Sequence, residues 1–178
     1  MATDTDPSLR VVDGSSTEQI AFRLAQVRSR GRLIVPRDVR KLASWLTESE
    51  SSPVILDQAS KERVLIYPRV QLEAKVNQLT EDVRTGRYIH WDTDWNGDVD
   101  LRKIPKRNLM WAIATRFRPS RIEPSGRMTL ERETLHSLGF EDDQLGEVFV
   151  GIQDDIIEIC SKAAFSSEVE QLRGFLPI

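Results

Sequence analysis

Arginine side chains gather in two segments of the chain. Residues 23–41 hold seven basic residues against one acid, a balance of +6, and residues 102–132 hold nine against two, a balance of +7. Residues 141–158 hold seven acids and no base, which helps to bring the whole chain to a net charge of -3. A guanidinium is permanently charged and its planar fork of N–H groups matches phosphate oxygens. Two basic segments in an acidic chain indicate a phosphate-binding face, although a solvated surface crossed by ion pairs is also compatible with them.

Catalytic chemistry has little support among the residue types present. The chain has two histidines, His90 and His136, and a single cysteine, Cys160, which falls in an expected buried strand. The adjacent carboxylates Asp154 and Asp155 stand where a hairpin turn is expected, and turns favour aspartate for structural reasons. No Gly-rich phosphate-binding motif is present. We therefore expect a protein that is not an enzyme and that uses no cofactor and no small-molecule substrate.

Residues 92–100 match the start of a calcium-binding EF-hand loop. Acids or asparagine occupy its positions 1, 3 and 5, and Gly97 occupies position 6. Position 12 is Lys103, where such a loop needs a bidentate glutamate, so a positive charge replaces an essential ligand. A plain Asp/Gly turn is favoured over a calcium site, and we expect no bound metal. The nearby Trp91, Trp95 and Trp111 are expected to pack against protein rather than to stack on bases.

The elements that must position the arginines fall into two stretches. Of the 178 residues, 39% are hydrophobic and 30% charged, which is typical of globular domains, and no apolar run is long enough to cross a membrane. Residues 1–18, rich in Asp, Ser and Thr, are expected to form a flexible tail. Residues 19–84 and 109–178 are expected to form two modules, joined by a linker at residues 85–108. We expect a cytoplasmic protein.

The same order of elements is expected in both modules, which makes the fold class α+β. The first module has a strand ending at Val27, a turn at Gly31, a strand at 33–35, a helix from Pro36 through Leu46, strands at 54–56 and 64–67 around a turn at 57–62, and a helix after Pro68. The second module has a turn at Gly126, a strand at 128–130, a helix ending at Gly139, strands at 147–152 and 156–160, and a helix ending at Gly174.

An internal repeat supports this order residue by residue. Residues 27–42 (VRSRGRLIVPRDVRKL) align with residues 122–137 (IEPSGRMTLERETLHS) at a constant offset of 95, which matches Gly31 with Gly126 and Arg32 with Arg127. Further along, Ile66 aligns with Ile159 at an offset of 93. Two copies with so long a period indicate a pseudo-twofold pair of modules rather than a solenoid.

Both basic segments surround the two Gly-Arg turns of this repeat. A hairpin can direct its arginines outward while its alternating apolar residues are buried. The candidate nucleic-acid contacts are the arginines nearest the turns: Arg28, Arg30, Arg32, Arg37 and Arg40 in the first copy, and Arg121, Arg127 and Arg132 in the second.

These residues also carry a family resemblance. GRLIVPRDVRKLA (31–43) resembles the GR-x-hydrophobic-P-x-x-hydrophobic-R segment of the AbrB/SpoVT swapped-hairpin superfamily. Two ordered copies, followed by VLIYPRVQLEAKV and by IIEICSKAAF, resemble the MraZ family of bacterial transcriptional regulators. The resemblance covers residues 20–84 and 109–173. At the aspartate of the family's Asp-x-x-x-Arg signature this chain has Arg28 and Glu123, where Arg28 would attract phosphate and Glu123 would orient Arg127.

The resemblance implies two tandem swapped-hairpin β modules with flanking helices. It implies a homo-oligomeric ring, associated with the nucleoid, that binds repeated sites on double-stranded DNA and regulates genes for division and the cell wall. An oligomeric scaffold or partner-binding protein that keeps this fold and has lost DNA recognition is the alternative, and the altered signature and the acidic stretch at 141–158 favour it.

Overall fold

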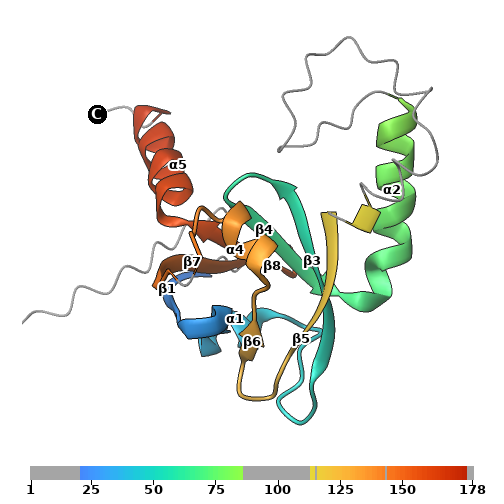
Figure 1. The fold of residues 1–178 in the computed structure, drawn as a ribbon, viewed down its shortest axis with the longest axis horizontal. Coiled ribbons are helices and arrows are strands. Elements are labelled where there is room, and N and C mark those ends of the chain that lie inside the picture. Colours follow the sequence, from blue (N-terminus) through green and yellow to red (C-terminus); the bar gives the residue numbers. More distant parts are fainter. Residues whose placement is uncertain (1–20, 86–112, 115, 143, 176–178) are drawn as a thin grey trace, which may run out of the picture.

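The computed structural model describes residues 21–85, 113–114, 116–142 and 144–175. These residues form antiparallel strands accompanied by helices (Figure 1), so the expected α+β class is confirmed. The first half contains β1 (Ala21–Val27), β2 (Arg32–Ile34), α1 (Arg37–Leu42), β3 (Ser52–Ser60), β4 (Arg63–Pro68) and α2 (Leu72–Arg84). The second half contains β5 (Phe117–Ile122), β6 (Arg127–Thr129), α4 (Arg132–Ser137), β7 (Gly146–Gln153), β8 (Ile156–Ser161) and α5 (Lys162–Phe175).

The two halves are interleaved in one six-stranded sheet. Its strand order is β1-β7-β8-β4-β3-β5, so each half contributes three of the strands. Only β3–β4 and β7–β8 are hairpins within a half, whereas β1 pairs with β7, β4 with β8 and β5 with β3 across the halves. The short strands β2 and β6 form a separate antiparallel ribbon, again with one strand from each half.

The strand register reveals a pseudo-twofold axis. In the ribbon, Leu33 faces Met128, and these residues are equivalent in the repeat at its offset of 95. In the sheet, Leu65 faces Glu158, which is its equivalent at the offset of 93. An antiparallel pair of equivalent residues lies on a twofold axis, because rotation by 180° exchanges the two. The axis therefore passes through both the ribbon and the centre of the sheet.

The main core is built from equivalent positions of the two copies. Val27 and Ile122, Leu33 and Met128, and Val35 and Leu130 are all at most 2% exposed. Each pair alternates with exposed residues, as a half-buried strand requires. Thr134 takes the helical position equivalent to Val39, and its buried hydroxyl accepts a hydrogen bond from Gln58 Nε2 at 2.7 Å. A buried polar group in the second copy is thus satisfied by a side chain of the first.

A smaller core lies on the other side of β3 and β4, under α2. It contains Ile55, Tyr67, Leu79 and Phe117. The Tyr67 hydroxyl donates to Asp57 Oδ2 at 2.8 Å, and Arg116 Nε donates to Asp57 Oδ1 at 2.8 Å. Asp57 was expected to begin a turn, but β3 continues through it to Ser60, with an irregularity between Asp57 and Ser60. The physical reason is that this buried carboxylate is paired on both sides within the sheet.

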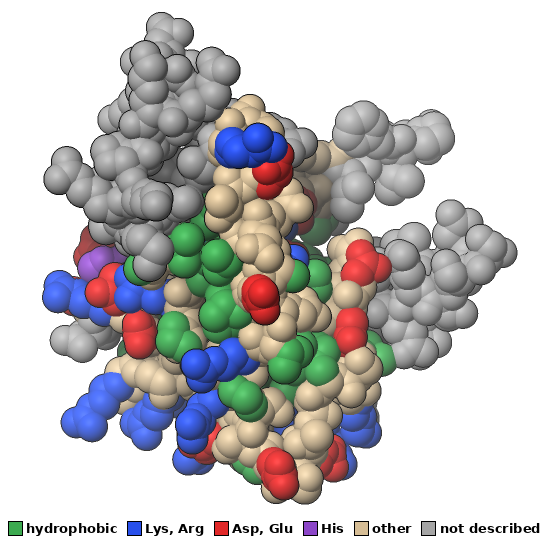
Figure 2. Space-filling view, turned by 90° about the vertical axis from the view of Figure 1, so that its right-hand side faces the viewer, with side chains coloured by type: hydrophobic (Ala, Val, Ile, Leu, Met, Phe, Trp, Pro, Cys, Tyr) green, Lys and Arg blue, Asp and Glu red, His purple; other side chains and the backbone are tan. Residues whose placement is uncertain are grey.

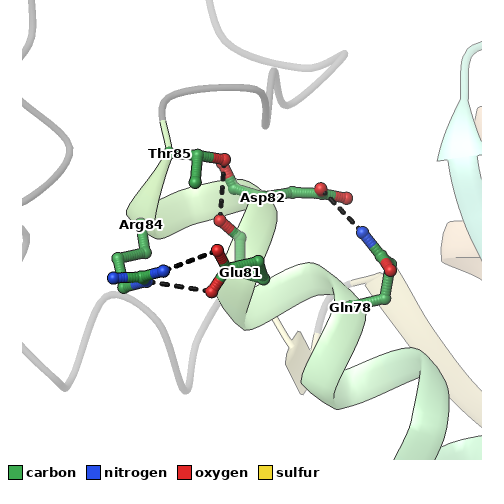
Figure 3. Close-up of polar contacts among 5 residues, drawn as sticks. All are labelled: Gln78, Glu81, Asp82, Arg84 and Thr85. Atoms are coloured by element: carbon green, nitrogen blue, oxygen red, sulfur yellow. Dashed lines mark hydrogen bonds and ion pairs between the residues drawn. The ribbon is translucent and has the colours of Figure 1, made fainter.

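Helix α2 ends in a turn held by its own side chains (Figure 3). Arg84 Nε donates to Glu81 at 2.9 Å, and Gln78 Nε2 donates to Asp82 at 2.9 Å. The Glu81 carbonyl accepts two hydrogen bonds from Thr85, one from its backbone N–H at 2.9 Å and one from its hydroxyl at 2.8 Å. Among the residues placed by the structure, no helix is both long and apolar enough to span a membrane.

The two Gly-Arg turns pack closely against the opposite half. Leu130 donates its N–H to the Gly31 carbonyl at 2.8 Å, and Val35 donates to the Gly126 carbonyl at 2.9 Å. Both glycines have positive φ, +68° and +84°. A Cβ on Gly31 would overlap the Leu130 carbonyl oxygen, and a Cβ on Gly126 would lie 2.8 Å from the Val35 carbonyl oxygen. Glycine is needed here both for its backbone conformation and for the space it leaves.

We predict that Gly31→Ala lowers the free energy of unfolding by at least about 3 kcal/mol, because a left-handed backbone and a backbone overlap are penalised together. Gly139→Ala is the matched control: its φ is +86°, but its Cβ would meet nothing nearer than Glu62 Oε1 at 3.9 Å. It should lose only about 1–2 kcal/mol. Urea unfolding followed by circular dichroism measures both, and equal losses would show that the close crossing of the halves does not matter.

Candidate nucleic-acid interface

The outward face of the β2–β6 ribbon carries two arginines, one from each half. Arg32 and Ile34 on β2, and Arg127 and Thr129 on β6, are exposed, whereas Leu33 and Met128 between them are buried. The register places Arg32 opposite Thr129 and Ile34 opposite Arg127. Ile34 is 46% exposed, so an apolar side chain stands in water between cations. The ribbon thus presents two guanidiniums and two methyl-bearing side chains on one surface.

The turn at one end of the ribbon carries three arginines, Arg28, Arg30 and Arg32. Arg28 donates its N–H to the Arg32 carbonyl at 2.8 Å, which closes the turn, and Arg30 has a φ of +61°. Arg32 folds back, with Nε 3.3 Å from the Ser29 carbonyl oxygen and Nη2 3.2 Å from Ser29 Oγ. Within the described chain, the side chains of Arg28 and Arg30 make no hydrogen bond or ion pair.

The turn at the other end is closed by an equivalent backbone hydrogen bond but differs in conformation and side chains, since Ser125, the equivalent of Arg30, has no positive φ. Glu123 donates its N–H to the Arg127 carbonyl at 2.9 Å, as Arg28 does in the first copy, and Gly126 donates to the Glu123 carbonyl at 2.8 Å. Glu123 was expected to orient Arg127 by a charge-assisted hydrogen bond. Among the described residues their side chains make no such contact, so this expectation is wrong. The two residues are joined only by the backbone hydrogen bond, and both side chains are exposed.

Three of the candidate arginines lie on the helices beside the turns. Arg37 begins α1 and is exposed. Arg40 is half-buried and donates to the carbonyls of Val35 (3.1 Å) and Pro124 (2.9 Å), so it holds α1 against the second turn. Arg132 begins α4 and pairs with Asp142, which also contacts His136 at 2.9 Å. Hydrogen bonds from Arg132 and His136 lower the pKa of the Asp142 carboxyl. The remaining candidate, Arg121, is exposed on β5.

Basic side chains gather at one end of the molecule. Figure 2 shows several Lys and Arg side chains together at its lower left, at the end where Figure 1 places β6. A hollow of about 520 Å³ lies between Arg30 and α4, and Arg132, Glu131, Glu141 and Asp142 share its lining. The surroundings of the first turn therefore mix both signs of charge.

Sequence reasoning missed Ile34 and Thr129 as members of this face. The signal was the alternation of strand residues, because burial of Leu33 and Met128 directs the neighbours of each outward. Arg118 was also passed over, and it is a structural residue: its side chain is 25% exposed and lies 3.5 Å from Glu131.

The groups considered for catalysis have structural roles. Burial raises the pKa of the Cys160 thiol to about 12. Asp154 and Asp155 form the β7–β8 turn, with φ of +51° and +63°, which confirms the expected turn. Asp155 accepts the Ser44 N–H at 2.7 Å. The described residues include no cluster of three or more metal-ligating side chains. His90, the calcium-like loop at 92–100 and Trp91, Trp95 and Trp111 lie outside the described residues.

A scan of protein-family models and a search of curated proteins found no match to this chain. The resemblance to the MraZ family therefore stays a prediction from the residues.

We predict that Arg40→Ala lowers the free energy of unfolding by about 1–3 kcal/mol, because two carbonyls lose a charged donor between the halves. Arg37→Ala removes the same charge from the same helix at an exposed position, where Arg37 makes no side-chain hydrogen bond or ion pair to any described residue, and should change stability by less than about 0.5 kcal/mol. Thermal unfolding distinguishes the two. An equal free energy of unfolding for both variants would show that the hydrogen bonds of Arg40 do not stabilise the contact between the halves.

We predict that the Cys160 thiol resists alkylation in the folded protein. A pKa raised to about 12 leaves the thiol protonated near pH 8, and the thiolate is the reactive form. Iodoacetamide labelling followed by mass spectrometry should be slow in buffer and fast in concentrated urea. Rapid labelling of the native protein would show that the site is accessible and activated.

Proposed function

We propose that this protein is a DNA-binding transcriptional regulator of the MraZ type. The observation that carries the proposal is the outward face of the β2–β6 ribbon, where Arg32 and Arg127 stand free of acidic partners among the described residues. A surface cation without an ion-pair partner gains little stability from its position. Two such cations, held on a short rigid ribbon, suit a ligand that brings its own negative charge.

The shape of the ribbon suits the major groove of duplex DNA. That groove is about 12 Å wide and accommodates a two-stranded β ribbon. Arginine makes a bidentate contact with guanine, and apolar groups contact the thymine methyl. Arg127 can make the first kind of contact directly, and Arg32 can make it when its guanidinium exchanges Ser29 for a base. Ile34 and Thr129 can make the second kind. Such a face would read base edges rather than attract phosphate alone.

The remaining free arginines suit the sugar-phosphate backbone. Arg28 and Arg30 flank one end of the ribbon, and Arg37 and Arg121 are exposed elsewhere on the two copies. Phosphate contacts set the position and register of a protein on the duplex, while base contacts provide specificity. Counterion release makes such binding strongly sensitive to salt. The chain's net negative charge would then confine binding to this face.

The interleaved strands support the swapped-hairpin part of the proposal. The first strand of each half pairs with the other half, β1 with β7 and β5 with β3, around a pseudo-twofold axis. An MraZ-type protein with this fold would assemble into a homo-oligomeric ring in the cytoplasm, at the nucleoid. Several chains on repeated sites would bind more tightly than one, through effective concentration. Regulation then follows from occlusion of a promoter or recruitment to it.

We predict that Arg32→Ala and Arg127→Ala each weaken binding to the preferred duplex by about 1–3 kcal/mol and reduce its preference over random DNA, since each removes a base contact. Arg84→Ala is the control, because it removes an equal charge from α2, where Arg84 pairs with Glu81. Electrophoretic mobility shift with genomic fragments, at several salt concentrations, provides the measurement. No binding by the unmodified protein at low salt would reject the proposal and favour the scaffold alternative.

A further inference from the structure

The two ends of the β2–β6 ribbon are closed by equivalent backbone hydrogen bonds and have different chemistry. Four pairs of equivalent positions bear on its exposed surface, and only Arg32 and Arg127 are identical. Arg28 is matched by Glu123, Arg30 by Ser125, and Ile34 by Thr129. Residues 28–34 therefore carry three positive charges, whereas residues 123–129 carry one positive and one negative charge.

Equivalent backbone hydrogen bonds close both turns, and the main chemical difference lies in their side chains, although Arg30 has a φ of +61° and its equivalent Ser125 has no positive φ. Arg28 and Glu123 each donate an N–H to the carbonyl of the arginine four residues on, at 2.8 and 2.9 Å, and all four side chains are exposed. The twofold relation therefore places a guanidinium at one end of the ribbon where it places a carboxylate at the other.

At the end of the ribbon that holds Glu123, the free positive charges lie on a helix rather than on the turn. The Arg40 contact with the Pro124 carbonyl, 2.9 Å, sets α1 beside the turn that contains Glu123. Helix α1 brings exposed Arg37 and Lys41 to that end. Their equivalents on α4 are Arg132 and His136, which both contact Asp142. Phosphate would thus meet turn residues at one end of the ribbon and helix residues at the other.

We propose that each chain binds duplex DNA in one direction, with the Arg28–Arg32 turn and the Glu123–Arg127 turn at fixed, non-interchangeable ends of a non-palindromic site. This inference rests on the proposed function. The backbone of B-DNA looks alike in both directions, so a symmetric ribbon would bind in two orientations equally. Here the free cations at one end lie on the turn itself, and those at the other end lie on helix α1 beside the turn. In addition, Ile34 and Thr129 would present different groups to the bases.

Directional footprinting tests this proposal. Ser29→Cys and Ser125→Cys place a single reactive thiol on either turn, and buried Cys160 does not compete for the label. Each variant is coupled to an iron chelate that cleaves nearby DNA, and is bound to an end-labelled duplex taken from the tightest-binding genomic fragment. Each conjugate should cleave one side of the site at least about tenfold more than the other, the factor that one good base contact supplies. The two conjugates should cleave opposite sides, and an oligomer on repeated sites should repeat this polarity.

A second variant tests the proposal without a label, in case a labelled turn fails to fold. Glu123→Arg with Ser125→Arg makes the turns alike in charge, and it should bind more tightly at low salt and show at least a several-fold weaker preference for one direction. Equal cleavage on both sides by both conjugates, or no change on making the turns alike, would overturn directional binding and leave DNA binding intact. Loss of all binding in the unmodified protein would instead overturn the proposed function, and this inference with it.

Discussion

The structure depends on the crossing of the two halves at Gly31 and Gly126. Each glycine carbonyl accepts an N–H from the other half, from Leu130 at 2.8 Å and from Val35 at 2.9 Å. These bonds exist only because neither glycine has a Cβ to hold the opposing backbone away. The same crossing aligns β2 with β6, which buries Leu33 against Met128 on the axis. Neither half could bury these residues alone, so interleaving is a requirement of the core.

The exposed face follows from this buried arrangement. Because strand residues alternate, burial of Leu33 and Met128 commits Arg32, Ile34, Arg127 and Thr129 to solvent. The close backbone contact on the inner side restricts the ribbon, so the backbone atoms from which its outer side chains extend are held in place. An ordered backbone loses little further conformational entropy on binding, so that only the exposed arginine side chains must still be ordered. The three cross-strand pairs of the β2–β6 ribbon thus supply both sides of it, the apolar side that faces the core and the cationic side that faces solvent.

The order of elements and the repeat could be predicted from sequence, because periodicity, prolines and glycines act locally. Long-range contacts could not. Helix α1 was expected to continue to Leu46, but it ends at Leu42, since the Ser44 N–H and the Trp45 Nε1–H instead bind Asp155 from the β7–β8 turn. In the same way, Asp57 suggests a turn to local reasoning, although its partner Arg116 keeps it within the sheet. Both differences come from residues more than fifty positions away along the chain.

The roles of the arginines show the same limit. The charge pattern of the sequence selects Arg28, Arg40 and Arg132 equally. In the structure, Arg40 donates to two carbonyls, one of them in the other half, and Arg132 pairs with Asp142. The side chain of Arg28 makes no hydrogen bond or ion pair to any described residue. An arginine already satisfied by the protein must lose those bonds before it can contact a ligand, whereas a free one exchanges only water. The free arginines therefore define the surface best suited to phosphate. Because the free arginines differ between the two ends of the ribbon, the surface has a direction that the pseudo-twofold strand pairing alone does not impose.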